Sequence, residues 1–297
     1  YLIDFSTASM TLFGFLLSGA DPALGRFAKS DLSQQSLMEI LVSDITNKSK
    51  ICGETREPRD IRFWRGIKTT RDGDIREINW YRFHLKGSLS VEWLPPTLIE
   101  FVGFYNDLYG TFDSAALPSK IVKVNLGNNL FFGTVDFTSF PSTLNYLSLS
   151  SNKLEGSIDL TRLPPNLEIL FLRGNSFGGC ISLEKLPRGM QVLNLSRNEL
   201  SEGLTFSNLP VTLTALNVKE NRFSGPLEFP HFSRKIYSID VSWNNFSGSI
   251  VVGDLPERSF MFDVSNNKDL GGEIVIRDRQ YDDVKIRNTY VEITYSE

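Results

Sequence analysis

The chain has 297 residues, of which 41% are hydrophobic and 12% aromatic, so it contains enough apolar side chains for one or two folded domains. Its 31 basic and 35 acidic residues give a net charge of −4. This slightly acidic balance excludes the basic surface typical of nucleic-acid-binding proteins, and we expect no nucleic acid among its partners.

Residues 1–30 are interpreted as an amino-terminal extension without a dominant hydrophobic period. The nearly uncharged stretch 5–20 is interrupted by Ser, Thr and Gly. It falls short of the roughly 20 apolar residues of a membrane-spanning helix, so we expect no transmembrane segment. Its phenylalanines either dock on a partner or fold back onto the next segment. Because the first residue is Tyr1 and not Met, we expect a processed mature protein or a fragment.

Residues 31–74 are predicted to form an amino-terminal cap that starts with a helix. Asp31 followed three residues later by Gln34 resembles a capping box, which favours a helix that begins at Asp31. Apolar residues then recur at helical spacing and indicate one buried face. That face consists of Leu37, Ile40, Leu41 and Ile45.

Residues 75–274 contain about nine repeats with a period of 23 residues. Asparagine recurs at every step of this period, at Asn106, Asn129, Asn152, Asn175, Asn198, Asn221, Asn244 and Asn267. The apolar frame around it reads, in one copy, Leu144, Leu147, Leu149, Asn152, Leu154, Gly156, Ile158, Leu160, Leu163 and Pro164. The frame weakens at both ends, where Phe83 replaces Asn and Leu270 lies one residue out of step, as expected of terminal repeats.

The frame L-x-x-L-x-L-x-x-N-x-[LF]-x-G-x-[ILV]-x-[LF]-x-x-[LF]-P resembles the leucine-rich repeat. Its Gly-x-Ile half is similar to the plant-type extracellular subclass and to related proteins of kinetoplastid protists. Trp64, Gly66 and Ile67 resemble the end of the amino-terminal cap of that subclass, but the cysteine pair of that cap is absent because Cys52 stands alone. The resemblance implies an α/β solenoid. This would be a curved array with a parallel sheet on its concave face, a helical amino-terminal cap and a short β carboxy-terminal cap.

Within each repeat, leucines that alternate with other residues predict a short strand, as in residues 147–149. Successive copies would stack about 4.7–4.9 Å apart in a parallel sheet. At the bend after each strand, the repeated asparagines are expected to form a ladder. An amide side chain offers an acceptor and two donors to backbone groups that lack ladder partners.

Residues 275–297 are predicted to form the carboxy-terminal cap. A solenoid needs such a cap because its last turn would otherwise expose an apolar face. Val291, Ile293 and Tyr295 alternate with polar residues, which indicates a strand that closes or extends the sheet.

The binding surface is expected on the concave sheet, where the side chains between the framework leucines face outward. Aromatic residues and arginine among small polar residues are typical of interface anchors. Groups of this kind occur on the early turns and in the middle of the array. The candidate partner-binding residues are Tyr81, Phe104, Tyr105, Phe171, Arg173, Lys219 and Trp243. For Phe104 and Tyr105, packing beneath the amino-terminal segment is an equal alternative.

A catalytic alternative rests on Asp240 and Asp263, which occupy the same phase on adjacent turns. Their carboxylates could approach to about 5 Å, the separation in retaining glycosidases, and would suit a carbohydrate-active enzyme. Polar residues stacked at one phase are also the ordinary result of a repeat, and Asn194 and Asn217 continue the row. The sequence has no Gly-x-Ser-x-Gly, phosphate-binding loop or dinucleotide fingerprint. We therefore expect that the protein is not an enzyme and has no cofactor and no metal.

The pattern as a whole favours a non-catalytic protein–protein interaction scaffold, a subunit or adaptor of a larger assembly whose partners are other proteins. It does not indicate a homo-oligomer. Two cysteines are too few for a disulfide framework, which favours an intracellular location, including the mitochondrion if a presequence has been removed. The alternative is an extracellular ligand-binding receptor ectodomain or an inhibitor of secreted enzymes. Three glycosylation sequons, at Asn47, Asn194 and Asn245, are weak evidence for that alternative.

Overall fold

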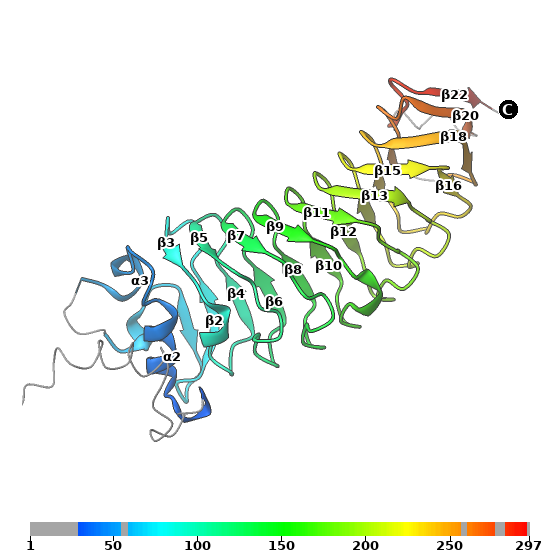
Figure 1. Cartoon of the computed structure of the whole chain (residues 1–297). Coiled ribbons are helices and arrows are strands. Elements are labelled where there is room, and N and C mark those ends of the chain that lie inside the picture. The colour runs from blue at the N-terminus through cyan, green and yellow to red at the C-terminus, as the bar shows by residue number, and fades with distance from the viewer. Residues whose placement is uncertain (1–28, 55–58, 257–259, 277–282, 296–297) are drawn as a thin grey trace, which may run out of the picture. The chain divides into compact units, whose positions relative to one another are not determined.

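The computed structural model describes residues 29–54, 59–256, 260–276 and 283–295 (Figure 1). The chain divides into two units, residues 1–33 and residues 34–297. The described part of the first unit contains a short 3-10 helix, η1 (Lys29–Asp31). The expected docking or folding back of residues 1–28 lies outside the described residues.

The second unit begins with helix α2 (Gln34–Leu41), followed by the one-turn helix α3 (Ser49–Cys52). The prediction that a helix begins at Asp31 is wrong, because Asp31 ends the 3-10 helix η1 and the α-helix begins at Gln34. The side chain of Gln34 joins this helix to the first repeats. The Gln34 Oε1 atom accepts from the backbone N–H of Ile75 at 2.8 Å and from the Thr97 hydroxyl at 2.9 Å. The face predicted from the helical spacing is largely buried, with Leu37, Leu41 and Ile45 each at most 2% exposed.

Gly87 allows the cap to approach the first repeat at backbone distance. The backbone N–H of Thr46 donates to the carbonyl oxygen of Lys86 at 2.7 Å, which fixes the cap loop beside this strand. A Cβ atom on Gly87 would lie 2.1 Å from the carbonyl oxygen of Asp44, and its φ of +125° is unfavourable for other residues. Glycine is therefore required here for the cap to dock.

The repeats build a first sheet in which successive turns pair in parallel, one period apart. Leu147 pairs with Leu170, and Leu170 pairs with Leu193, so the same frame position is in register from turn to turn. Only β1 is antiparallel to its neighbour β2. The strands in sheet order are β1 (Ile67–Thr69), β2 (Ile75–Asn79), β4 (Glu100–Val102), β6 (Lys123–Asn125), β8 (Tyr146–Ser148), β10 (Ile169–Phe171), β12 (Val192–Asn194), β14 (Ala215–Asn217), β17 (Ser238–Asp240), β19 (Met261–Asp263) and β21 (Val284–Lys285).

A second parallel sheet forms from the glycine-containing half of each repeat, where the sequence predicts only a turn. Five of its strands are short and end at a glycine with positive φ, such as Gly133 at 80° and Gly156 at 87°. Its last strand is the one predicted near residue 291. The strands are β3 (Lys86–Ser88), β5 (Asp107–Gly110), β7 (Leu130–Gly133), β9 (Lys153–Gly156), β11 (Ser176–Gly179), β13 (Glu199–Gly203), β15 (Arg222–Gly225), β18 (Asn245–Val252), β20 (Asp269–Ile276) and β22 (Tyr290–Tyr295), with β16 (Glu228–Phe229) beside β18.

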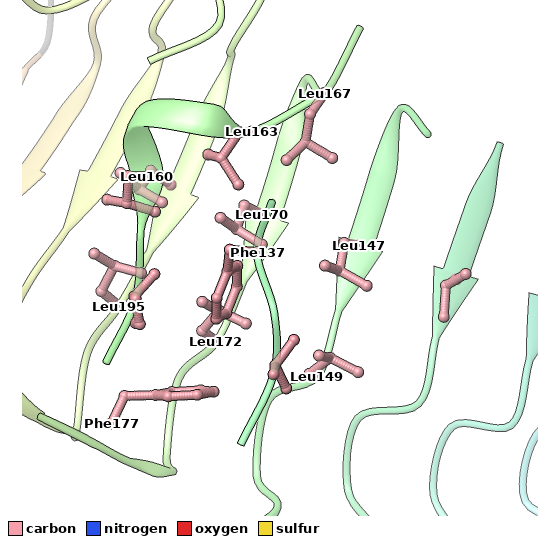
Figure 2. Close-up of a cluster of buried hydrophobic side chains, with 14 of the residues drawn as sticks. Phe137, Leu147, Leu149, Leu160, Leu163, Leu167, Leu170, Leu172, Phe177 and Leu195 are labelled. Carbon is pink, nitrogen blue, oxygen red and sulfur yellow. The ribbon is translucent and has the colours of Figure 1, made fainter. Parts of the chain in front are cut away.

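The framework residues form one continuous core between the two sheets. Leu147 and Leu170 from the first-sheet strands and Phe177 from the second-sheet segment belong to one cluster of buried side chains (Figure 2). All three are fully buried. Two turns carry a one-turn 3-10 helix on their remaining side, η3 (Val91–Trp93) and η4 (Leu160–Arg162), and a third, η2 (Ile61–Phe63), lies in the cap before β1.

The eight repeated asparagines bridge consecutive turns by hydrogen bonds. Asn198 is representative: its Nδ2 donates to the carbonyl oxygens of Leu172 in the preceding turn at 3.1 Å and Leu195 in its own turn at 2.9 Å. Its Oδ1 accepts from the backbone N–H of Phe177 at 3.2 Å. The chain is therefore an α/β solenoid with its turns tied together along one edge.

Candidate functional site

The candidate site is the outward surface of the first sheet. We call it the first-sheet face and define it as the residues four, two and one positions before each ladder asparagine and before Phe83, which takes the place of that asparagine in the first turn. The residue immediately before the asparagine has an unusual backbone conformation. In each turn this residue adopts a left-handed conformation, with φ between 53° and 68°, at Arg82, Tyr105, Asn128, Ser151, Gly174, Arg197, Glu220, Trp243 and Asn266.

Glycine and asparagine adopt this conformation readily, but the other residue types do so at a cost of about 1–2 kcal/mol. Tyr105 and Trp243 are therefore held in an unfavourable backbone state, and both side chains are about half exposed, at 47% and 55%. Such strain often accompanies function. Both residues are predicted from their chemistry alone, and their shared backbone state is not, because neither residue type signals positive φ.

An amino-terminal aromatic cluster lies at the start of this face and consists of Tyr81, Arg82, Phe104 and Tyr105. The rings of Tyr81 and Phe104 stack with their centroids 5.6 Å apart and an interplanar angle of 12°. Phe104 meets Tyr105 edge-on at 5.8 Å. The guanidinium of Arg82, which the sequence analysis did not select, lies 5.3 Å from the Tyr81 ring centroid and 4.8 Å from that of Tyr105.

A second group lies in the middle of the array around Phe171. Its ring meets Tyr146 of the preceding turn at 5.9 Å, and the ammonium of Lys123 lies 5.8 Å from the Tyr146 centroid. Arg173 is exposed on the same strand segment. Tyr146 and Lys123 were missed because they lie two residues earlier in the repeat than Phe171. From that position Tyr146 meets Phe171 diagonally, and Lys123 contacts Tyr146.

The remaining candidates do not join either group. Lys219 is half-buried, with its ammonium 3.9 Å from the carboxylate of Glu220. Trp243 stands alone near the carboxy-terminal turns, without a ring contact to another described residue. The alternative in which Phe104 and Tyr105 pack beneath residues 1–28 concerns a segment outside the described residues.

Asp240 and Asp263 lie at directly paired positions of β17 and β19. Each carboxylate accepts hydrogen bonds from the backbone N–H and the hydroxyl of the serine two residues later, Ser242 or Ser265. Burial raises the pKa of Asp240, and the charge of Asp263 adds to this, while the bonds from Ser242 oppose it. Among the described residues there is no cluster of three or more His, Cys, Asp or Glu side chains that could hold a metal ion.

Replacing Asp240 by asparagine is expected to stabilise the protein at neutral pH. Asn194 makes the same two bonds to Ser196, so the amide fits this position without the burial cost of a charge. Because the native pKa of Asp240 is raised, the stability linked to this group is present at low pH and is lost as the pH rises through that pKa. We expect a gain of about 0.2–1 kcal/mol at pH 7 and none at pH 3.

Thermal unfolding at both pH values measures this difference. Asp159→Asn is the control, and we expect it to have the opposite pH dependence, because hydrogen bonds from Thr161 lower the pKa of Asp159. Its carboxylate stabilises the protein above the unfolded pKa, and the contribution is lost as the pH falls. A gain from Asp240→Asn that is equal at pH 3 and pH 7 would contradict the electrostatic explanation.

Two surface openings lie at the amino-terminal end. One has a volume of about 320 Å³ and borders the aromatic cluster. Its lining residues are His84, Tyr105, Asn106, Asp107, Asn128, Asn129, Leu130 and Ser151. The other, of about 340 Å³, lies on the cap near Gln35 and Arg62. Tyr105 therefore contributes both to the cluster and to the adjacent pocket.

Comparison with known proteins identifies the fold. No protein family model matches the chain, and no curated protein sequence is significantly similar to it. A plant ice-binding protein of known structure aligns with a TM-score of 0.59 over 88% of this chain and 94% of its own length, at 19% identity. At this identity the likeness shows the fold alone. Together with the repeat and the two parallel sheets, it shows that the chain is a leucine-rich-repeat solenoid.

Plant receptor ectodomains align less closely. The ectodomain of the Arabidopsis receptor kinase HAESA, in complex with a peptide hormone, gives a TM-score of 0.49 over 88% of this chain and 49% of its own length, at 15% identity. A pollen receptor kinase gives 0.46 over 64% of this chain and 92% of its own length, at 26% identity. These comparisons offer no support for the expected intracellular location. No helix among the described residues has the length and apolar character to cross a membrane.

Proposed function

We propose that the chain is a non-catalytic, ligand-binding ectodomain that holds a peptide or protein on its first-sheet face. The observation that carries this proposal is the amino-terminal aromatic cluster. Tyr81 and Tyr105 expose 44% and 47% of their surface although they stack with neighbouring groups. Large, rigid aromatic rings beside an arginine provide contact area at little entropic cost, as binding hot spots do.

The proposal that the protein is not an enzyme rests on how its polar groups are used. Asp240 and Asp263 accept hydrogen bonds within their own turns, as Asn194 does in its turn. These bonds give the carboxylates a structural role at a position where other turns carry an amide. The carbohydrate-active alternative therefore has no separate support from the described residues.

A specific observation favours the second candidate, a scaffold or adaptor inside the cell. Cys180 is an exposed free thiol and Cys52 is also unpaired, which suits a reducing compartment. The extracellular proposal is supported by the exposed sequon asparagine Asn245 at the start of β18. Mass spectrometry of the protein from its native source separates the two: a glycan on Asn245 is expected for the ectodomain, and an unmodified Asn245 for the adaptor.

Affinity capture with the whole chain tests the binding site. We expect the double variant Tyr81→Ala, Tyr105→Ala to lose at least about tenfold of the captured partner, because it removes two aromatic anchors. The matched control is Tyr237→Ala, a tyrosine that is 53% exposed outside the cluster and should have no effect. Circular dichroism checks that each variant folds.

A second pair, Phe171→Ala with Arg173→Ala, tests whether the ligand extends to the middle of the array. Its effect should be smaller if the amino-terminal cluster is the main anchor. Equal recovery of every partner by wild type and by both pairs would contradict binding on the first-sheet face.

A further inference from the structure

Arg82 is the most distinctive feature of the amino-terminal aromatic cluster, because its guanidinium lies against two tyrosine rings and remains exposed. The distances to the ring centroids of Tyr81 and Tyr105 are 5.3 and 4.8 Å. Stacking on aromatic faces restricts the guanidinium without using its N–H groups. Those donors form a planar fork that matches the two oxygens of a carboxylate. The group is thus pre-organised to receive an anion.

Three acidic residues of these turns are already paired with other cations. Glu77 pairs with Lys68 at 2.7 Å, Glu100 with Lys123 at 3.5 Å, and Asp107 with Lys86 at 3.8 Å. Among the described residues, no carboxylate lies within ion-pair distance of Arg82 or of Arg65. The Arg65 guanidinium also rests on an aromatic ring, 5.1 Å from the centroid of Phe83. Two arginines at this end are therefore available to a ligand.

The charge of the surrounding segment also favours an anionic ligand. Residues 48–86 contain eleven basic and six acidic residues, an excess of five positive charges in a chain whose net charge is −4. Lys50 adds a cation beside the pocket, since its ammonium donates to the carbonyl oxygen of His84 at 3.3 Å. This local excess of positive charge attracts acidic ligands and repels basic ones.

We propose that the ligand is an acidic peptide segment, with an aspartate or glutamate carboxylate bound by Arg82 between Tyr81 and Tyr105. This inference rests on the function proposed above and specifies its ligand. The adjacent pocket of about 320 Å³ shares Tyr105 as a wall, and six of its eight lining residues are polar. It offers hydrogen-bonding groups to the part of the peptide that neighbours the carboxylate.

Selection from a phage library of random dodecapeptides, panned on the full chain, tests this specificity. We expect the enriched peptides to carry Asp or Glu. Binding of a synthetic copy should weaken at least tenfold in Arg82→Gln and should weaken as sodium chloride is raised. Arg197→Gln is the matched control. Arg197 has the same left-handed backbone five turns later, but its guanidinium is already paired with Glu220 at 3.0 Å.

The outcomes separate this inference from the proposed function. Acidic peptides that lose binding in Arg82→Gln and keep it in Arg197→Gln support the inference. Neutral or basic peptides that depend on Tyr81 and Tyr105 would overturn it and leave the proposed binding site in place. An enriched acidic peptide that is indifferent to Arg82→Gln would also overturn it. If no peptide depends on either tyrosine, the inference fails, and affinity capture with the tyrosine variants decides the proposed function separately.

Discussion

Replacing Asn198 by alanine is expected to lower the free energy of unfolding by about 2–5 kcal/mol. The substitution leaves the buried backbone N–H of Phe177 without its amide acceptor, and each orphaned buried group costs about 1–3 kcal/mol. It also removes the bonds to the carbonyl oxygens of Leu172 and Leu195. The total exceeds the effect of most single substitutions because several bonds between two turns are lost together.

The arrangement of the ladder sets the upper limit of this effect. The carbonyl oxygen of Leu172 also accepts from Asn175, and that of Leu195 also accepts from Asn221. Each carbonyl is thus shared by two consecutive asparagines and keeps one donor when Asn198 is lost. The ladder is a chain in which every member supports its neighbours, so the substitution weakens the array without opening it completely.

Urea unfolding followed by circular dichroism measures the change. The control is Asn208→Ala, an exposed turn residue whose side chain is expected to contribute within about 0.5 kcal/mol. If Asn198→Ala unfolds at the same urea concentration as the control, the ladder bonds contribute nothing net, and the turns are held by apolar packing alone.

The sequence predicts the parts of the fold that depend on a repeated residue type. Leucines at positions such as 147 and 149 alternate with serines, and this alternation predicts a strand whose leucines lie on one buried side. The second sheet has no such signal. Its strands, as in residues 176–179, are rich in serine and glycine, which have low β propensity. They pair because stacking of the first sheet places the glycine segments one turn apart.

In the candidate site, too, the sequence predicts the residues that the repeat places and not those that depend on the local backbone. Tyr81 and Phe104 occupy the same phase one period apart, so their stacking follows from the repeat. Arg82 occupies the next phase, which an extended chain would direct away from this face. The left-handed conformation there, with φ of 54°, brings its guanidinium back beside the rings. Only three of the nine residues in this row, Asn128, Gly174 and Asn266, are of types that favour positive φ. Arginine itself gives no such signal, so the sequence alone could not place Arg82.

Replacing Phe177 by alanine is expected to lower the free energy of unfolding by about 3–5 kcal/mol. The ring is fully buried and meets Phe137 edge-on at 5.8 Å, between side chains of both sheets (Figure 2). Its removal leaves a cavity that rigidly paired strands on both sides cannot collapse to fill. Contacts with the neighbouring turn are lost as well, because the ring packs against residues outside its own repeat.

Phe177→Leu is the informative comparison, because Leu154 and Leu200 occupy the same frame position in the adjacent turns and are fully buried. A leucine therefore suits the backbone at this position, and its cost should stay below about 1.5 kcal/mol. Urea unfolding of the two variants separates cavity size from residue identity. Equal losses in both would show that this turn needs an aromatic ring specifically. The interchange of Leu and Phe along the frame would then reflect individual packing at each turn and not a common apolar requirement.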